Sequence, residues 1–193
     1  MAAGLATAKS APQASDSLAN PRLTVLTDRK MLVITMAGDP DKVAGQAFKE
    51  LYKYFYKHAA KQSEKEIPVP RARWPMALSS QDKGTWIGQY GLPVPEGFPS
   101  PIQGNLRVED WKYGLVAEIL HVGAYDVEMP TLDRLKDYIR FNGYAILGEY
   151  EEEYLIGPGL ILKGNPEKYR TILRLRLTKD SQAEQIAARP VFR

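Results

Sequence analysis

Several residue types and patterns are scarce or missing in this chain of 193 residues. It has no cysteine, which excludes disulfides, thiolate catalysis and cysteine-ligated zinc. The two histidines, His58 and His121, lie far apart, so a histidine-rich metal site is not expected, whereas a site with oxygen ligands stays open. No apolar run approaches the roughly 20 residues that span a bilayer. We therefore expect a soluble, cytoplasmic protein without a cofactor.

Neither sign of charge dominates the sequence. The chain has 26 basic and 23 acidic residues, with a net charge of +3, and the two signs are interleaved rather than gathered in a stripe. We expect no contact with nucleic acid or membrane, and we favour a monomer. With 44% hydrophobic residues, the chain can form one well-buried domain, or two small modules that share a core.

The ends of the chain differ in composition from its middle. Residues 1–20 are rich in Ala and Ser and have neither a charged start nor an apolar stretch, which predicts a disordered tail; a cryptic export signal is the alternative. Residues 92–104 are dense in Pro and Gly, which predicts a linker or a lid. We expect one domain over residues 21–180, made of halves 21–91 and 105–180, and a C-terminal extension over 181–193.

The two halves repeat one order of elements. Residues 22–38 hold two β-rich pieces around a turn, Asp39-Pro40 starts a helix, and apolar residues recur at spacings of three and four over residues 43–61. In the second half, a strand ends at Gly123, Pro130 starts a helix, and Asn142-Gly143 caps it. Further strands are expected at residues 78–80, 85–90, 144–147, 152–156 and 169–177. The predicted fold class is α+β, with two β-α-β-β units in a mostly antiparallel sheet, both helices on one face and a ligand cleft on the other.

Period-two alternation over residues 150–156 places Tyr150, Glu152 and Tyr154 on one face of a strand, while Glu149, Glu151 and Glu153 point the other way, toward solvent. An acid among aromatic rings needs a hydrogen-bond donor or a cationic ligand, since burial of an unpaired carboxylate is costly. An acid-rich edge strand whose charges discourage aggregation is the alternative interpretation.

Residues 118–158 carry a family resemblance, at His121-Val-Gly-Ala-Tyr125, Pro130-Thr131, Gly143-Tyr144 and Glu152-Glu-Tyr154-Leu155. They resemble the GyrI-like small-molecule-binding domain, which is also the effector-binding domain of bacterial multidrug-responsive activators. The resemblance is strong in the second half and weak in the first. It implies a duplicated pseudo-dimer with a central aromatic pocket that binds a small molecule, marked by a glutamate at Glu152.

The sequence departs from the family pattern at two places, which bear on ligand identity. It has Ile156-Gly-Pro158 where Ser-Asp-Pro is common, and Glu151 where a histidine is frequent. No part of the chain resembles a DNA-binding region, which implies a stand-alone domain. Stand-alone members include drug-sequestering proteins and hydrolases that open the strained cyclopropane ring of DNA-alkylating natural products.

Aromatic residues supply the other site candidates. Trp86 and Tyr90 share a face of one strand, and Trp111 and Tyr113 share a face of another, where flat or cationic ligands can stack; each ring is alternatively a core residue. The predicted ligand-binding residues are Glu152, Trp86, Tyr90, Trp111, Tyr113 and Tyr150. His121 is expected to be a structural hydrogen-bond partner rather than a catalyst.

Three functions stay open. In the first, an aromatic pocket with Glu152 binds lipophilic, planar or cationic molecules and sequesters xenobiotics. In the second, the protein is a hydrolase in which Glu152 is the general base and Tyr154 or Tyr125 polarises a carbonyl on a cyclopropane-bearing substrate. The third is a protein-interaction role such as gyrase inhibition.

Overall fold

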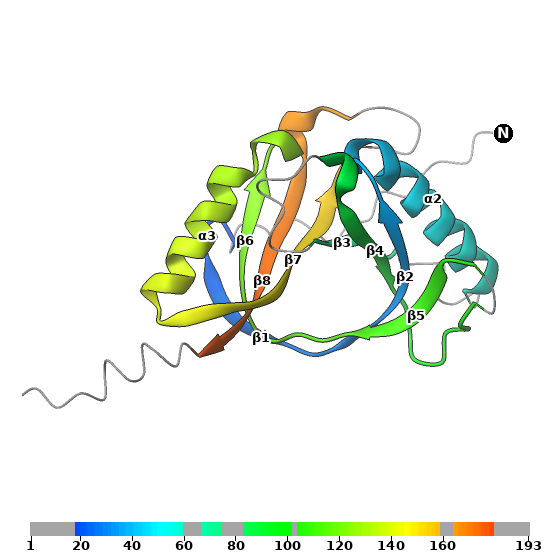
Figure 1. Ribbon diagram of the computed structural model, residues 1–193, viewed down its shortest axis with the longest axis horizontal. Helices are drawn as coiled ribbons and strands as arrows, with labels where there is room; N and C mark the ends of the chain where they lie inside the picture. The colour runs from blue at the N-terminus through cyan, green and yellow to red at the C-terminus, as the bar shows by residue number, and fades with distance from the viewer. Residues whose placement is uncertain (1–17, 60–66, 75–82, 102–103, 159–163, 180–193) are drawn as a thin grey trace, which may run out of the picture.

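The computed structural model describes residues 18–59, 67–74, 83–101, 104–158 and 164–179, which form one curved sheet with two long helices (Figure 1). The first half contains β1 (Arg22–Leu26), β2 (Arg29–Ala37), α2 (Pro40–His58), β3 (Arg71–Trp74), the 3-10 helix η3 (Lys83–Thr85) and β4 (Ile87–Pro93). The second contains β5 (Leu106–Trp111), β6 (Gly114–Val122), η4 (Tyr125–Val127), α3 (Met129–Phe141), β7 (Tyr144–Ile156), η5 (Pro166–Lys168) and β8 (Arg170–Lys179). None of the helices in these ranges combines the length and apolar character that a membrane crossing requires.

The described strands form an antiparallel sheet in the order β1-β6-β8-β7-β3-β4-β2-β5, so β7 and β3 meet at its centre. Both halves run strand, glycine, helix, strand, strand. Gly38 and Gly123, which follow β2 and β6, have φ angles of 127° and 139°, and their N–H groups donate to the carbonyls of Trp86 and Tyr169 at 2.8 and 3.1 Å. The two halves thus repeat the same turn and the same contact.

The predicted helix starts and the predicted end of α3 are confirmed, whereas α2 ends at His58, before the predicted residue 61. Asp39 caps α2 by accepting from the N–H of Asp41 at 3.2 Å, and Pro40 occupies the first turn. Asn142 caps the C-terminus of α3, and Gly143 has a φ of 73°, which favours glycine. The buried residues of the two helices are Ala47, Leu51 and Phe55 in α2, and Leu132, Leu135 and Ile139 in α3.

The two ends of the sheet are joined by a continuous ribbon. β1 pairs with β6, β2 pairs with β5, and the register Arg22↔Glu118 continues unshifted into Arg29↔Trp111. At the interruption, Asp28 accepts from the N–H of Tyr113 at 3.0 Å and pairs with Lys112 at 2.8 Å. β1 and β5 therefore pass beneath the arched sheet and lead to its opposite ends (Figure 1).

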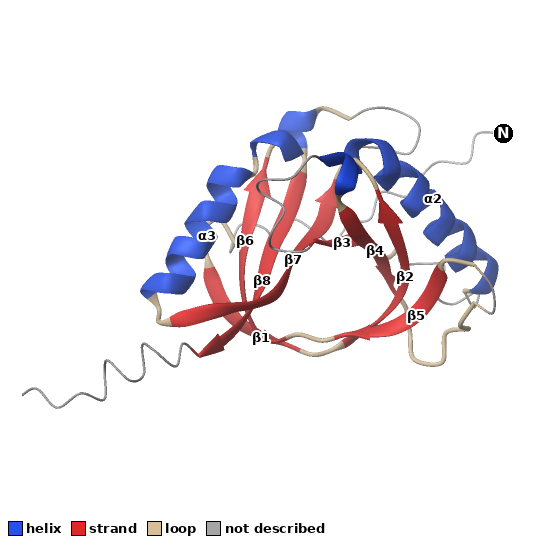
Figure 2. Ribbon diagram, in the orientation of Figure 1, coloured by secondary structure: helices blue, strands red, loops and turns tan. Residues whose placement is uncertain are grey.

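Both helices lie on the outer face of the arch, one toward each side (Figure 2), which confirms the α+β fold with helices on one face. Leu51 and Leu135 from the helices pack in one cluster with sheet residues such as Tyr90 and Tyr150. Glu152 lies on this helix-bearing face, two residues from Tyr150 in the same strand. The inner face, where the cleft was predicted, holds aromatic side chains and ion pairs, so Glu152 lies on the other side of the sheet from them.

Three boundaries differ from the prediction. Leu18, in the predicted tail, is buried, and its carbonyl accepts a hydrogen bond of 2.8 Å from the N–H of Leu120. The rest of the predicted tail (1–17), the predicted strand 78–80 and the predicted extension 181–193 lie outside the described residues. β4 continues to Pro93, inside the predicted linker. β7 is one strand rather than two, because a register shift near Gly148, with a φ of 83°, lets pairing with β8 resume.

Candidate functional site

A buried carboxylate lies at the centre of the sheet, on the helix-bearing face. Glu152 in β7 stands opposite Ala72 in β3, and only 7% of its surface is exposed. The hydroxyl of Tyr154 donates a hydrogen bond of 2.5 Å to its Oε2 atom. Glu152 forms no ion pair within the described ranges, although its charge is removed from bulk water.

A second carboxyl meets Glu152 from another element. Glu128 precedes α3 and lies close enough to Glu152 for the charge of Glu152 to raise its pKa. The hydroxyl of Tyr150 donates to Glu128 Oε1 at 3.1 Å, whereas Glu128 Oε2 is buried without a hydrogen-bond partner in the described part of the chain. Although Glu128 occupies the N-cap position of α3, its side chain makes no capping bond. Its carboxyl is directed to the site instead.

Both acids hold their protons more tightly than ordinary glutamates. Burial, together with the charge of Glu152, raises the pKa of Glu128 to about 9. Burial also raises the pKa of Glu152, although the hydrogen bond from Tyr154 opposes that rise. Two carboxylates in a site of low polarity cannot both ionise easily, so the pair favours the state with one shared proton.

A chain of aromatic rings surrounds the two carboxyls. Successive members lie edge to face or tilted, with ring centroids 5.3 to 6.0 Å apart, and the chain joins both halves of the molecule. In order it consists of Trp86, Trp74, Tyr90, Phe48, Tyr154, Tyr125 and Tyr169. We call these seven residues, with Glu128, Tyr150 and Glu152, the carboxyl–aromatic cluster.

Polar groups inside this cluster are left without partners. The Tyr90 hydroxyl and Trp74 Nε1 are buried and have no hydrogen-bond partner within the described residues, although Trp74 lies close enough to Glu152 to lower its pKa. Both side chains expose at most 3% of their surface. Phe48, Trp86 and Tyr125 are half-buried, so part of the ring chain reaches the surface. The cluster thus combines unused donors, two acids and partly exposed rings.

Glycine at position 88 creates the space for one of these rings. A Cβ atom at Gly88 would lie 2.5 Å from the Trp74 ring, which packs against both Trp86 and Tyr90. The sequence pattern Trp86-Ile-Gly88-Gln-Tyr90 therefore presents two rings on one face with a gap between them, into which a third ring from β3 fits.

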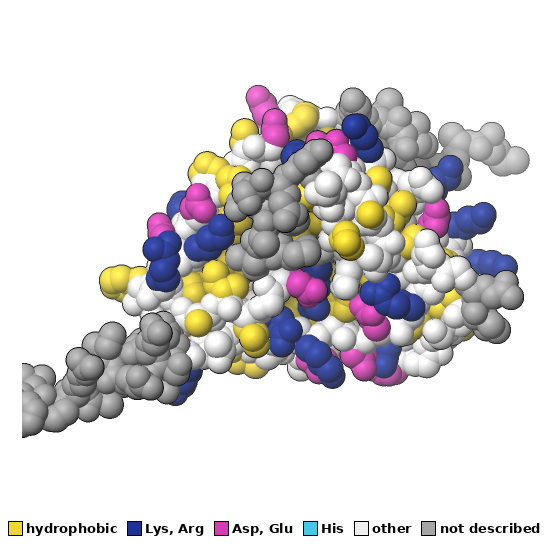
Figure 3. Space-filling model, viewed as in Figure 1, with side chains coloured by type: hydrophobic (Ala, Val, Ile, Leu, Met, Phe, Trp, Pro, Cys, Tyr) yellow, Lys and Arg dark blue, Asp and Glu magenta, His cyan; other side chains and the backbone are white. Residues whose placement is uncertain are grey.

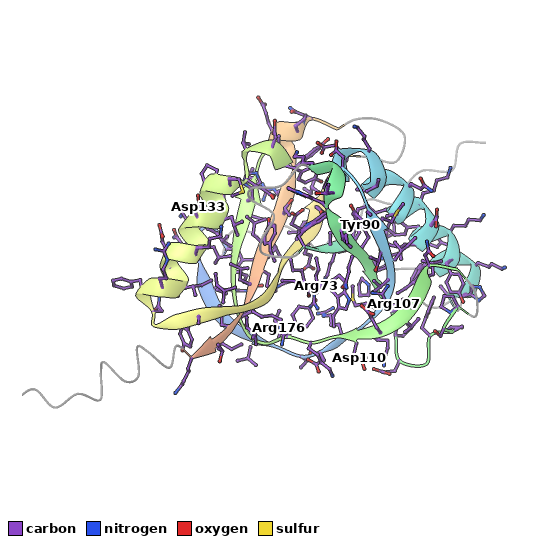
Figure 4. The ribbon with its side chains drawn as sticks, in the orientation of Figure 1. Arg73, Tyr90, Arg107, Asp110, Asp133 and Arg176 are labelled. Atoms are coloured by element: carbon purple, nitrogen blue, oxygen red, sulfur yellow. The ribbon has the colours of Figure 1, made fainter. Side chains whose placement is uncertain are left out.

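The structure brings together six predicted site residues and separates two. Glu152, Tyr150, Tyr154, Tyr125, Trp86 and Tyr90 all belong to the carboxyl–aromatic cluster. Trp111 and Tyr113 lie on the opposite face, where the Arg73 guanidinium is 4.1 and 5.0 Å from their ring centroids. Figure 4 labels Arg73 beneath the arch. Their placement in the site is wrong because β5 and the start of β6 direct these rings to the inner face of the arch, away from Glu152.

The opposite face of β7 holds a buried ion network, so the prediction that Glu151 and Glu153 face solvent is also wrong. Arg174 pairs with Glu151, Glu153 and Glu118 at 2.6, 3.0 and 2.9 Å. Arg71 pairs with Glu153 at 3.0 Å, and Arg73 with Glu151 at 2.8 Å. Burial alone would raise the pKa of Glu153, but the guanidiniums of Arg71 and Arg174 outweigh it and lower that pKa.

His121 has a structural role, as expected. It is buried; its Nδ1 atom lies 3.0 Å from the Thr131 hydroxyl, and its Nε2 atom lies 3.0 Å from the Ala124 carbonyl. Since a carbonyl only accepts, Nε2 carries a proton. The imidazole thus ties β6 to the beginning of α3.

Sequence reasoning missed four cluster residues, Glu128, Phe48, Trp74 and Tyr169. An acid before a Pro-containing helix start is typical of a cap, and Phe48 belongs to the apolar stripe of α2, so neither pattern points to a site. For Trp74 a signal was available, since the small residue Gly88 between two aromatic residues indicates a close approach by another group.

Two surface depressions lie away from this cluster. One, of about 240 Å³, lies between Thr27–Lys30 and Pro93–Glu96, and another, of about 490 Å³, lies on the exposed side of α2 near Gln46 and Lys49. Basic and acidic side chains stand next to each other near β1 and β5 (Figure 3), as in the pairs Lys30–Asp110 and Lys112–Asp28. Neither depression combines aromatic rings with a buried charge.

Solved structures share this fold. No protein-family model and no curated protein matches the chain. An uncharacterized conserved protein from Listeria innocua is similar over 83% of this chain and 93% of its own, with 21% identity and a TM-score of 0.70. A hydrolase encoded by lin2189 from Listeria innocua is similar over 83% and 92%, with 20% identity and a TM-score of 0.67. The EcmrR C-terminal domain is similar over 83% and 98%, with 13% identity and a TM-score of 0.64.

These similarities confirm the fold that the resemblance to GyrI-like domains implied. The chain has the α+β architecture of those structures, at nearly their full length. At identities of 13 to 21% the agreement concerns the fold, and the chemistry of the site rests on the side chains of this chain.

Proposed function

We propose that this protein binds lipophilic, planar or cationic small molecules at the carboxyl–aromatic cluster, with Glu152 as the counter-charge. The observation that carries this proposal is a buried glutamate with no cationic partner in the described residues, surrounded by rings from both halves of the chain. An ordinary structural acid at this depth would be paired, as Glu151 and Glu153 are on the other face. A cation bound between the rings would gain both charge attraction and contact with the ring faces.

Access to Glu152 requires movement of side chains. With 7% of its surface exposed, the carboxylate is covered by neighbouring rings, among which Phe48 and Tyr125 both contact Tyr154. Phe48 and Tyr125 come from different halves of the molecule and are half-buried. We propose that a ligand enters by parting these two rings. Sequestration of xenobiotics in the cytoplasm is the biological role we assign to such binding.

Binding is tested by titrating purified protein with tetraphenylphosphonium, a lipophilic monocation, using calorimetry. We expect Glu152→Gln to weaken binding by about tenfold or more, because the charge is lost in surroundings of low polarity. Glu149→Gln is the matched control in the same strand, since Glu149 has a side-chain exposure of 43%. Equal affinity of wild type and Glu152→Gln would refute the proposal.

Tryptophan fluorescence gives a second test with an internal control. Trp74 and Trp86 belong to the cluster, whereas Trp111 lies on the opposite face. A planar cation such as ethidium should quench emission in wild type and in Trp111→Phe, and quenching should fall in Trp86→Phe. Quenching that disappears only in Trp111→Phe would place the ligand elsewhere.

A second candidate function, hydrolysis of a strained cyclopropane ring, is favoured by the Tyr125 hydroxyl, which has no hydrogen-bond partner within the described residues. In this reaction, ionised Glu152 removes a proton from water, the water oxygen bonds to a ring carbon, and the carbon–carbon bond breaks. The released electron pair moves through the conjugated substrate to its carbonyl oxygen, which takes a proton from Tyr125 or Tyr154. The proton on Glu152 then returns to the tyrosine through solvent. A neighbour of similar fold bears the name hydrolase, which fits this alternative.

Product analysis separates the two functions. The protein is incubated with a cyclopropane-bearing alkylating agent, and products are followed by mass spectrometry. Formation of the water adduct that is lost in Glu152→Gln and reduced in Tyr125→Phe would support hydrolysis. Tight binding without any adduct would support sequestration alone.

A further inference from the structure

Glu128 is a half-buried titratable group with a buried Oε2 atom, and the proposed function does not explain it. It comes from the segment before α3, whereas Glu152 comes from the centre of β7, so the fold brings two distant acids together. Glu128 occupies the N-cap position of α3 without making a capping bond, and its carboxyl instead accepts from Tyr150, which shares a strand face with Glu152. It lies close enough for the charge of Glu152 to raise its pKa.

The hydrogen bonds around the two acids are unequal. Glu152 accepts from Tyr154 at 2.5 Å, and Trp74 also stabilises its charge. Glu128 accepts a longer bond of 3.1 Å from Tyr150 through Oε1, and its buried Oε2 has no donor in the described residues. An acceptor oxygen without a donor is costly when ionised, but the same oxygen satisfies its bonding as a hydroxyl that donates to a neighbouring carboxylate.

We propose that Glu128 is a second ligand-binding residue of this site, which shares one proton with Glu152 and so limits the site to one negative charge. The proton resides on Glu128, and Glu152 carries the charge. Ligands with one positive charge are thereby matched, whereas dications are left with an uncompensated charge. This inference rests on the proposed binding function for its ligand class, but the shared proton is a property of the protein alone.

The tyrosines near the pair remain neutral over the pH range of the test. The hydroxyls that face it come from β7, β4 and η4, and one cation lies in η3: Tyr150, Tyr154, Tyr90, Tyr125 and Lys83. Burial raises the pKa of each of these four tyrosines, so they stay neutral up to pH 9.5. Changes in binding between pH 7 and 9.5 therefore report the carboxyl pair.

The first experiment needs no ligand. Infrared spectroscopy of the protein at pH 7 should show the band of a buried, protonated carboxylic acid in wild type. The band should disappear in Glu128→Gln and persist in Asp126→Asn, an exposed acid two residues away that serves as the matched control. Absence of the band in wild type at pH 7, or its persistence in Glu128→Gln, would overturn the shared proton, whatever the protein binds.

The second experiment measures tetraphenylphosphonium affinity between pH 7 and 9.5. In wild type it should rise by about three- to tenfold as Glu128 ionises and adds a second charge. Glu128→Gln keeps a neutral amide in place of the acid, so its affinity should not vary with pH, and at pH 7 it should lose less than about threefold. The same pH dependence in both proteins, or an equal loss in Glu128→Gln and Glu152→Gln at pH 7, would contradict the assignment.

The two experiments test different claims, so one can give a negative result without the other. If tetraphenylphosphonium does not bind wild type but the infrared band behaves as expected, the binding function is wrong and the proton pair stands. If the cation binds through Glu152 and the band is absent, the binding function stands and the role of Glu128 is refuted.

Discussion

The two faces of β7 use the same residue type in opposite ways. Glu151 and Glu153 face inward under the arch, where Arg71, Arg73 and Arg174 neutralise them. Glu152 faces the helices and has tyrosine hydroxyls and another acid as neighbours. A lowered pKa for Glu153 and a raised pKa for Glu152 follow directly. Glu151 and Glu153 are already paired with arginines, whereas Glu152, which has no cation partner in the described residues, can still pair with a cationic ligand.

The largest expected effect comes from removing a cation from the buried ion network on the inner face. Arg174→Met leaves Glu118, Glu151 and Glu153 buried with fewer cations, so we expect the free energy of unfolding to fall by about 3–5 kcal/mol in urea denaturation. Arg140→Met, which removes an exposed pair with Asp137, should cost roughly 0.5 kcal/mol or less. Similar losses in both variants would contradict the comparison.

Opposite pH dependences should distinguish the two faces. Because the folded pKa of Glu128 is about 9, the native state binds more protons than the unfolded state above pH 4.5. The stability that Glu128 contributes to the folded state is fully present below pH 4.5 and is lost as the pH rises toward 9. From pH 5 to 9, we expect wild type to lose up to about 5 kcal/mol of stability relative to Glu128→Gln.

Glu153→Gln should behave in the reverse sense. The lowered pKa of Glu153 contributes stability above its unfolded value of 4.5, and this contribution is lost as the pH falls through the folded pKa. The variant should therefore be less stable than wild type at pH 7 and approach it near pH 3. Thermal unfolding across this range checks both slopes, and parallel curves for the two variants would contradict the assignment of charges.

A side chain added at Gly88, next to Trp74, should disturb the carboxyl–aromatic cluster and leave the ion network on the other face of the sheet unchanged. Gly88→Ala places a Cβ atom 2.5 Å from the Trp74 ring, so we expect a loss of about 1–3 kcal/mol and weaker ligand binding. In Gly45→Ala, within α2, nothing lies within 4 Å of the new atom, and a gain of about 0.5–1 kcal/mol is expected. Chemical denaturation of both proteins measures the contrast.

The smallest effect is expected from a single hydroxyl. Tyr154→Phe removes the 2.5 Å donor to Glu152 and should cost about 1 kcal/mol at neutral pH. Without that donor the Glu152 pKa should rise further, so tetraphenylphosphonium binding at pH 7 should weaken. Tyr56→Phe, at an exposed position of α2, is the control. Unchanged binding in Tyr154→Phe would show that this hydroxyl does not hold the carboxylate ionised.

Much of the fold could be predicted from local signals. Asp39-Pro40 and Asn142-Gly143 mark helix ends through capping chemistry, and Gly38 and Gly123 mark equivalent turns because their φ angles favour glycine. Alternation also separated Glu152 from its two neighbours correctly. These features depend on residues close together in sequence, so periodicity captures them.

Contacts between distant segments could not be predicted in this way. Alternation shows that Glu151 and Glu152 point apart, but it does not show that Arg71 and Arg174 arrive from β3 and β8 to neutralise Glu151. Likewise, the shared face of Trp111 and Tyr113 was correct, yet the side of the sheet depends on how β5 passes under the arch. The proximity of Glu128 to Glu152 depends on how α3 packs against β7.

The unshifted ribbon of β1–β2 against β5–β6 makes the halves mutually dependent. Each half gives its first strand to the sheet of the other, since β1 pairs with β6 and β5 pairs with β2. Either half produced alone would expose unpaired strand edges and would lack part of the ring chain. A single unit of this design would have to exchange strands with a second copy to pair these edges, whereas here the exchange is intramolecular. The second half supplies both acids, and the rings come from both halves.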